Sequence, residues 1–117
     1  MSPTERRRFH RITHSFLIRY QSPTAQGMAW RMAPLKDLSM VGLRFLCERL
    51  FEVGEKFELE LVIPTFKHPI GLTARVVWSR LVNRELHLFE CGVAFAGMSE
   101  PVRQQLEQAV NALLTTQ

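Results

Sequence analysis

The chain has 117 residues, of which 46% are hydrophobic and 22% charged, and its formal net charge is +4. This length fits one domain with a single core, and the composition excludes a disordered chain. The positive charge is confined to residues 1–20, which hold five arginines and a single acid, Glu5. Residues 21–117 carry ten bases and ten acids, so no extended basic track for a polynucleotide is expected there.

Four arginines lie close together near the N-terminus, and no lysine accompanies them: Arg6, Arg7, Arg8 and Arg11. A guanidinium group is planar and always charged, and it can bind a phosphate through two parallel hydrogen bonds. The cluster therefore favours recognition of a phosphate or a guanine. By itself, a terminal run of charge is more often a solvated tail. We expect residues 1–13 to form a flexible, arginine-rich, ligand-binding arm.

Between His14 and Phe95, apolar and polar residues alternate with a period of two, which is typical of β-strands. The pattern predicts strands over residues 16–20, 28–38, 42–47, 57–63, 70–78 and 86–95. Turn-forming residues predict a loop over 21–27. The alternation in 70–78 places Trp78 on the apolar face. Many short strands joined by turns favour a barrel or a sandwich over residues 14–98.

The apolar period changes to three or four residues after position 98, which predicts a helix over 99–115. Ser99 is a suitable N-cap, and Pro101 suits the first turn. The apolar stripe consists of Val102, Leu106, Ala109, Val110 and Leu113. Such a helix either covers one end of the barrel or mediates dimerisation, and the sequence leaves both roles open. Arm, strands and helix together are expected to form one domain.

The turn between the second and third predicted strands contains Asp37, Ser39 and Gly42. Asp37, the sole aspartate of the chain, can accept hydrogen bonds from a guanine or hold an arginine in place. Ser39 can donate to a ligand or form hydrogen bonds within its own turn. Gly42 permits a backbone conformation, or a close approach, that a side chain would block. Alone, this pattern is more often structural than functional.

Together the two patterns resemble the PilZ domain, the bacterial receptor module for cyclic di-GMP. Its ligand motifs are R-x-x-x-R and [D/N]-x-S-x-x-G. Their defined positions are filled here, in order, by Arg7, Arg11, Asp37, Ser39 and Gly42. Other matching stretches are Gly42-Leu43-Arg44-Phe45, Leu59-Glu60-Leu61, Val76-Val77-Trp78 and Gly92-Val93-Ala94-Phe95. The resemblance runs from about Glu5 to the C-terminal helix, nearly the whole chain.

The resemblance implies a mainly β fold: a six-stranded antiparallel PilZ-type β-barrel with a basic N-terminal loop and a C-terminal α-helix. It implies a cyclic di-GMP receptor or adaptor that needs no cofactor and no metal. The implied ligand-binding residues are Arg6, Arg7, Arg8, Arg11, Asp37, Ser39 and Gly42. In the family, the position of Arg6 influences whether one ligand or a stacked pair is bound, and arginine there resembles the pair-binding members.

Ordering the arm costs free energy, which suggests a switch. Fixing the backbone costs roughly 1–2 kcal/mol per residue. A charge-assisted hydrogen bond supplies roughly 1.5–3 kcal/mol. We therefore expect the arm to be mobile without ligand and to fold over the barrel when ligand binds. A receptor of this kind signals by exposing or covering a surface, so a downstream protein partner is expected.

Two other functions stay open at this stage. The chain could be a PilZ-like protein-interaction module without ligand, or a small barrel that binds single-stranded nucleic acid, although the neutral remainder of the chain argues against the latter. An enzyme is not expected, because Ser39 lies in no nucleophile-elbow motif. Cys47 and Cys91 fit buried thiols of a reduced cytoplasm, and no apolar run reaches membrane-spanning length.

Overall fold

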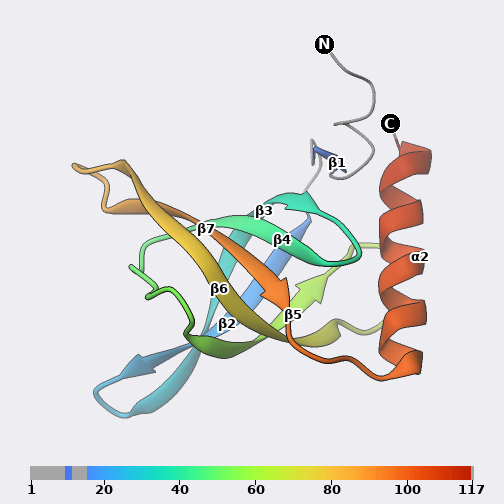
Figure 1. The fold of residues 1–117 in the computed structure, drawn as a ribbon, viewed down its shortest axis with the longest axis horizontal. Coiled ribbons are helices and arrows are strands. Elements are labelled where there is room, and N and C mark those ends of the chain that lie inside the picture. Colours follow the sequence, from blue (N-terminus) through green and yellow to red (C-terminus); the bar gives the residue numbers. More distant parts are fainter. Residues whose placement is uncertain (1–9, 12–15, 117) are drawn as a thin grey trace.

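The computed structural model describes residues 10–11 and 16–116, with the backbone alone at 10–11 and 113–116. Its elements, in chain order, are β1 (His10–Arg11), β2 (Leu17–Thr24), β3 (Gly27–Leu38), β4 (Gly42–Cys47), β5 (Lys56–Val62), β6 (Ile70–Asn83), β7 (Leu88–Phe95) and α2 (Glu100–Thr116). Within this part of the chain, β2 to β7 pair antiparallel in the order β3-β2-β5-β6-β7-β4, and pairing of β3 with β4 closes the barrel (Figure 1). The expected six-stranded barrel with a C-terminal helix is confirmed.

Aromatic side chains fill the centre of the barrel. Tyr20, Phe45, Phe51 and Phe57 are buried, and their ring centroids lie between 4.6 and 6.4 Å apart. Three of the four lie on strands at positions that face inward, as the alternation in the sequence predicts. Such tilted and edge-on contacts add to the free energy gained by burying the rings.

The helix α2 packs its apolar stripe against the barrel. Its N-cap is Ser99, whose hydroxyl accepts a hydrogen bond from the backbone N–H of Val102 at 3.4 Å. Leu106 and Ala109 are fully buried within the core, and Val110 is partly buried against it. Figure 1 shows α2 standing along one side of the barrel. The helix therefore covers part of the barrel, in keeping with the first of the two roles left open by the sequence.

The loop predicted over 21–27 is wrong. Strands β2 and β3 continue pairing out to Thr24 and Gly27, and only two residues form the turn between them. The Thr24 hydroxyl donates to the carbonyl of Gly27 at 3.0 Å, and Gly27 adopts a φ of 120° that a residue with a side chain rarely takes. Local turn formers were outweighed by cross-strand pairing, which extends the hairpin beyond the barrel (Figure 1).

The inward position predicted for Trp78 is also wrong. Strand β6 continues to Asn83, and the register of its pairing with β7 shifts between Val76 and Trp78. Val76 remains in the core, but the shift moves Trp78 opposite Gly92 and leaves its side chain only partly buried. A β-bulge inserts one residue and thereby reverses the face on which the following residues lie, here up to the second register shift between Leu81 and Asn83.

Candidate functional site

Asp37 lies between two strands that both carry arginine. A register shift in the β3–β4 pairing, between Leu35 and Asp37, places Asp37 opposite Arg44. On the other side of β3, the backbone of Arg11 in β1 pairs with Asp37. The carboxylate is 7% exposed and forms an ion pair with Arg44. The shift therefore sets a nearly buried acid beside the guanidinium of the neighbouring strand.

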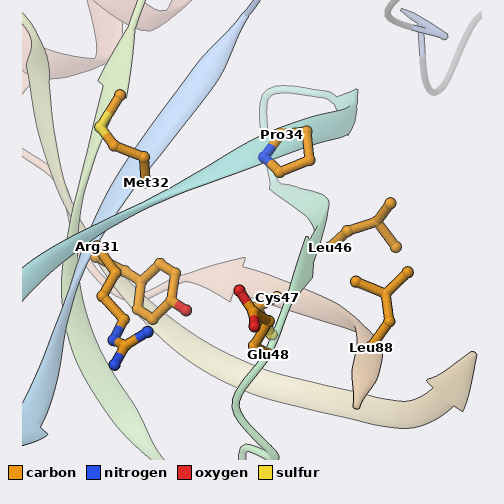
Figure 2. Close-up of a pocket in the computed structure, with 8 residues that line it drawn as sticks. Arg31, Met32, Pro34, Leu46, Cys47, Glu48 and Leu88 are labelled. Carbon is orange, nitrogen blue, oxygen red and sulfur yellow. The ribbon is translucent and has the colours of Figure 1, made fainter. Parts of the chain in front are cut away.

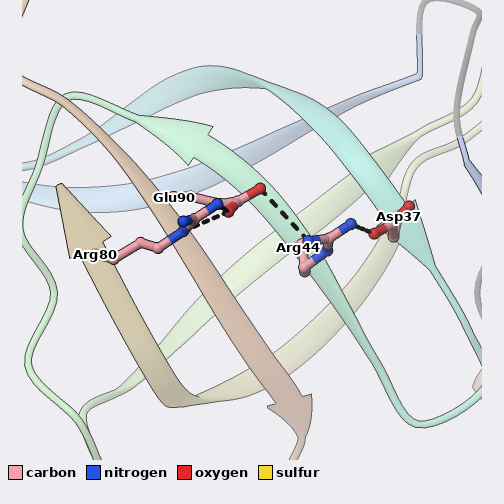
Figure 3. Close-up of polar contacts among 4 residues, drawn as sticks. All are labelled: Asp37, Arg44, Arg80 and Glu90. Atoms are coloured by element: carbon pink, nitrogen blue, oxygen red, sulfur yellow. Dashed lines mark hydrogen bonds and ion pairs between the residues drawn. The ribbon is translucent and has the colours of Figure 1, made fainter. Parts of the chain in front are cut away.

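Four charged side chains form a row across the outside of the barrel, from β3 through β4 and β7 to β6 (Figure 3). Arg44 pairs with Asp37 and lies 3.7 Å, Nη1 to Oε2, from Glu90. Arg80 donates two hydrogen bonds to Glu90 Oε1, at 2.9 Å from Nε and 2.7 Å from Nη2. Acids and bases alternate along the row, and the two acids are buried while the arginines reach solvent.

Ser39 closes the turn that follows β3. Its hydroxyl accepts hydrogen bonds from the backbone N–H groups of Val41, at 3.2 Å, and Gly42, at 3.3 Å, and can donate to the carbonyl of Gly42 at 3.3 Å. Its own backbone N–H donates to that carbonyl at 2.9 Å. The sequence left Ser39 either to donate to a ligand or to form hydrogen bonds within its own turn. Its described contacts are those of a turn residue. This turn holds Asp37 at its position on the outer face.

Gly42 serves a close approach between strands. A β-carbon at this position would lie 2.1 Å from the backbone carbonyl oxygen of Val93 in β7. The position that a β-carbon would take is occupied by the backbone of β7, with which β4 pairs so that Gly42 lies opposite Ala94. Gly42 therefore lets β4 begin pairing with β7 immediately after the Ser39 turn.

The predicted ligand-binding arginines are placed only in part. Arg6, Arg7 and Arg8 lie outside the described residues. The backbone of Arg11 is described, and its pairing with Asp37 brings the two predicted motifs to adjacent strands. The predicted residues Asp37, Ser39 and Gly42 lie together around the β3–β4 turn, with Asp37 and Ser39 at its start and Gly42 at its end.

Three further residues of this face were not assigned a role from the sequence: Arg44, Glu90 and Arg80. Their positions follow from strand register, which one sequence does not reveal. Trp78 also belongs here, because its ring covers Gly92, where a β-carbon would lie 2.3 Å from the indole Nε1. Gly92 pairs with Trp78 on one side and with Arg44 on the other. The only signal for this contact in the sequence was the glycine itself, because its place opposite the Trp78 ring follows from the strand register.

A separate pocket of about 260 Å³ opens where β3 and β4 diverge (Figure 2). It is lined by Tyr20, Arg31, Met32, Pro34, Leu46, Cys47, Glu48 and Leu88. Burial raises the pKa of the Tyr20 phenol and of the Cys47 thiol, so both groups are neutral at neutral pH. One cation and one anion among largely uncharged walls do not suit a ligand with two negative charges, so we place the candidate site at Asp37.

Two other kinds of site were considered for the part of the chain that the structure describes. No group of three or more His, Cys, Asp or Glu side chains there could hold a metal ion. No helix within the same residues is both long and apolar enough to cross a membrane.

Solved structures with the same fold include PilZ-domain proteins. YcgR of Escherichia coli in complex with c-di-GMP is 20% identical, with a TM-score of 0.69 over 95% of this chain and 47% of that chain. MrkH of K. pneumonia in its apo state is 15% identical, with a TM-score of 0.75 over 99% of this chain and 52% of that chain. The PilZ domain of YcgR with c-di-GMP is 19% identical, with a TM-score of 0.64 over 91% of this chain and 87% of that chain. No curated protein matches the sequence.

Fold and site together define a small antiparallel β-barrel domain with a charged outer face beside the turn after β3. The family model of the PilZ domain matches residues 5–112, and the chain belongs to this family. It spans about half the length of the full YcgR and MrkH chains, 47% and 52% respectively.

Proposed function

We propose that the chain is a cyclic di-GMP receptor whose site lies on the outer face of the barrel at Asp37. The observation that carries the proposal is the pairing of Arg11 with Asp37, because it joins the arginine motif to the turn motif. The solved relatives include a YcgR structure in complex with c-di-GMP. Membership of the same family supports the same ligand class here.

The chemistry of the ligand suits the residues of this face. Cyclic di-GMP is a dianion with two phosphodiesters and two guanines. Guanidinium groups of Arg7 and Arg11 would fork onto phosphate oxygens or onto guanine O6 and N7. The carboxylate of Asp37 would accept hydrogen bonds from guanine N–H groups. Arg6 and Arg8 would add charge and stacking surface, with Arg6 favouring a stacked pair of ligands.

We further propose that ligand orders the arm, residues 1–13, over the barrel, residues 14–98, by extending the order of His10 and Arg11, which already pair with β3, to the rest of the arm. A protein partner would read this change. A cytoplasmic location is supported by Cys47 and Cys91, which are both free thiols. We assign no catalytic activity to the site, since the described hydrogen bonds of the Ser39 hydroxyl are all made within its own turn.

The experiment is a calorimetric titration of cyclic di-GMP into the wild-type chain and into the variants Arg7→Ala and Arg11→Ala. Each substitution removes charge-assisted hydrogen bonds worth roughly 1.5–3 kcal/mol, so affinity should fall by about 10- to 100-fold. Arg103→Ala, which removes an exposed arginine of α2, is the matched control and should bind as the wild type does. A stoichiometry of two, reduced to one by Arg6→Ala, would support the stacked pair.

Competing ligands separate this function from the alternatives. GMP should bind far more weakly than the cyclic dinucleotide, because it offers one guanine and a single phosphomonoester in place of two guanines and two phosphodiesters. Binding of short single-stranded DNA that persists in moderate salt would favour a nucleic-acid-binding barrel. Absence of cyclic di-GMP binding in a folded sample would contradict the receptor and favour a protein-interaction module.

A further inference from the structure

We propose that Glu90 is a positioning residue of the ligand site. It offers Arg44 a second carboxylate, so that Arg44 can release Asp37 when a guanine binds to the Asp37 carboxylate. This inference rests on the proposed function. It concerns an acid on β7 that belongs to neither ligand motif. Its effect on the ligand passes through Arg44.

Glu90 is an unusual acid for the outside of a barrel, because its side chain is only 4% exposed. A buried carboxylate has to be paired with cations or hydrogen-bond donors. One oxygen, Oε1, receives both hydrogen bonds from Arg80. The other oxygen, Oε2, faces Arg44 at 3.7 Å, which is longer than a hydrogen bond. Among the described residues, Glu90 thus has one oxygen that is held in place by two hydrogen bonds and one that forms only a long ion pair.

Arg44 lies between two carboxylates and is bound closely to one of them. It forms an ion pair with Asp37 and only a loose one with Glu90. Its side chain is 35% exposed, so the guanidinium has room to move toward solvent or along the strand surface. A small shift toward β7 would shorten the distance to Glu90 and lengthen that to Asp37. Arg44 can therefore exchange partners without leaving the surface of the barrel.

Ligand binding creates the need for this exchange. A guanine presents adjacent N1–H and N2–H donors, which match the two oxygens of one carboxylate. In the described structure, Oδ2 of Asp37 is already taken by Arg44. If Arg44 had no other acid, releasing Asp37 would leave a cation without a partner. Because Glu90 Oε2 lies within reach, the exchange conserves an ion pair while Asp37 becomes available.

Arg80 holds the carboxylate of Glu90 in the orientation that this role requires. Its Nε and Nη2 both bind Oε1, which fixes the orientation of the carboxylate and points Oε2 toward Arg44. Figure 3 shows the resulting row, with Glu90 between Arg80 and Arg44 and with Asp37 beyond Arg44. The arrangement separates a fixed half of the row, on β6 and β7, from an exchangeable half, on β4 and β3.

The test is a double-mutant cycle on cyclic di-GMP affinity, measured by calorimetry with wild type, Glu90→Gln, Arg44→Ala and the double variant. Glu90→Gln removes the second carboxylate and should weaken binding about tenfold. In the Arg44→Ala background Asp37 is already free, so Glu90→Gln should have no further effect. Glu60→Gln is the matched control. It breaks the ion pair between Glu60 on β5 and Arg19 on β2, outside the proposed site, and should leave the affinity for cyclic di-GMP unchanged.

A spectroscopic readout separates positioning from a merely structural role. The side-chain Nε–H signal of Arg44, followed by NMR, should shift when cyclic di-GMP is added to the wild type and should shift less in Glu90→Gln. An unchanged Arg44 signal in ligand-saturated wild-type protein would overturn the inference without any variant. If Glu90→Gln does not fold, Glu90→Asp, which keeps the charge but shortens the reach, takes its place in the cycle.

The remaining outcomes of the calorimetric cycle distinguish a failure of this inference from a failure of the proposed function. Wild-type binding with equal affinity in Glu90→Gln overturns this inference and leaves the receptor function standing. An equal loss of affinity in the presence and absence of Arg44 also overturns it, because Glu90 would then act independently. If the wild-type chain binds no cyclic di-GMP, the proposed function fails and the inference falls with it.

Discussion

Gly42 and Gly92 each lie where another part of the fold approaches too closely for a side chain, but the obstacles differ. At Gly42 the atom nearest to an added β-carbon would be the Val93 carbonyl oxygen, 2.1 Å away, which is part of the backbone of β7. At Gly92 the nearest atoms belong to the indole of Trp78. A strand cannot move without losing its pairing, whereas a partly buried ring can rotate aside.

We therefore predict that Gly42→Ala destabilises the domain by about 3 kcal/mol or more, and that Gly92→Ala costs about 1 kcal/mol. Urea unfolding of both variants measures the difference. Gly92→Ala should also change the fluorescence of Trp78, because its ring has to move. Equal destabilisation by the two substitutions would contradict this account of the close approaches.

Cys91 is fully buried in the barrel, and this burial raises the pKa of its thiol to about 12, from an ordinary value of 9.0. The folded state therefore keeps a proton that the unfolded state loses at a lower pH. The contribution to stability is complete below pH 9 and is lost as the pH rises toward 12, because the unfolded state then binds fewer protons.

The free energy of unfolding should fall between pH 9 and 12 with a contribution from Cys91 of up to about 1.4 kcal/mol per pH unit. Chemical denaturation at a series of pH values, compared with Cys91→Ala, isolates this contribution from that of Tyr20 and Cys47. The variant should show a shallower decline. Parallel pH profiles for the two proteins would refute the assignment.

At the scale of elements, α2 owes its position to two fully buried side chains, Leu106 and Ala109. The helix has an acidic residue in its first turn and a serine cap, which favour its start. Packing of the apolar stripe, and not these local preferences, supplies most of the stability of a short helix. The barrel is correspondingly left with an exposed apolar surface if the helix detaches.

Leu106→Ala should lower the free energy of unfolding by about 2–5 kcal/mol, because it removes buried methyl groups and leaves a cavity between α2 and the barrel. Gln108→Ala, at an exposed position of the same helix, is the control and should change stability by less than about 0.5 kcal/mol. Equilibrium denaturation followed by circular dichroism measures both. Similar midpoints for the two variants would mean that α2 contributes little to the core.

At the scale of the whole molecule, closure of the barrel brings together segments that are far apart in the chain. β3 pairs with β1, β2 and β4, and β7 joins β4 to β6. As a result, Arg11, Asp37 and Arg44 lie on adjacent strands, and Glu90 and Arg80 extend the same surface. The proposed ligand would thus contact an arm and a barrel face at the same time.

For this reason we predict that cyclic di-GMP slows amide hydrogen exchange throughout residues 1–11, while GMP at the same concentration does not. Ordering these residues would consume part of the binding free energy, at roughly 1–2 kcal/mol per residue. Exchange measured by mass spectrometry, with and without each nucleotide, provides the test. Unchanged exchange in residues 1–11 in a sample that binds cyclic di-GMP would argue against ligand-induced ordering.

The sequence by itself determined the class of fold and the identity of the two motifs. A period of two reveals strands and a period of three to four reveals a helix, since these repeats follow from local backbone geometry. Ser99, Leu106 and Ala109 were therefore assigned correctly. The same local signals failed at residues 21–27, where pairing between strands outweighed turn propensity.

Only the tertiary structure decided which residues meet. The bulges beside Asp37 and Trp78 change the face of the residues that directly follow them, and a single sequence does not mark the inserted residue. The partners of Asp37 and Glu90 come from other strands, so their identity depends on the register set when the barrel closes. Periodicity constrains which side chains can share a face, whereas non-local strand pairing determines which of them are neighbours.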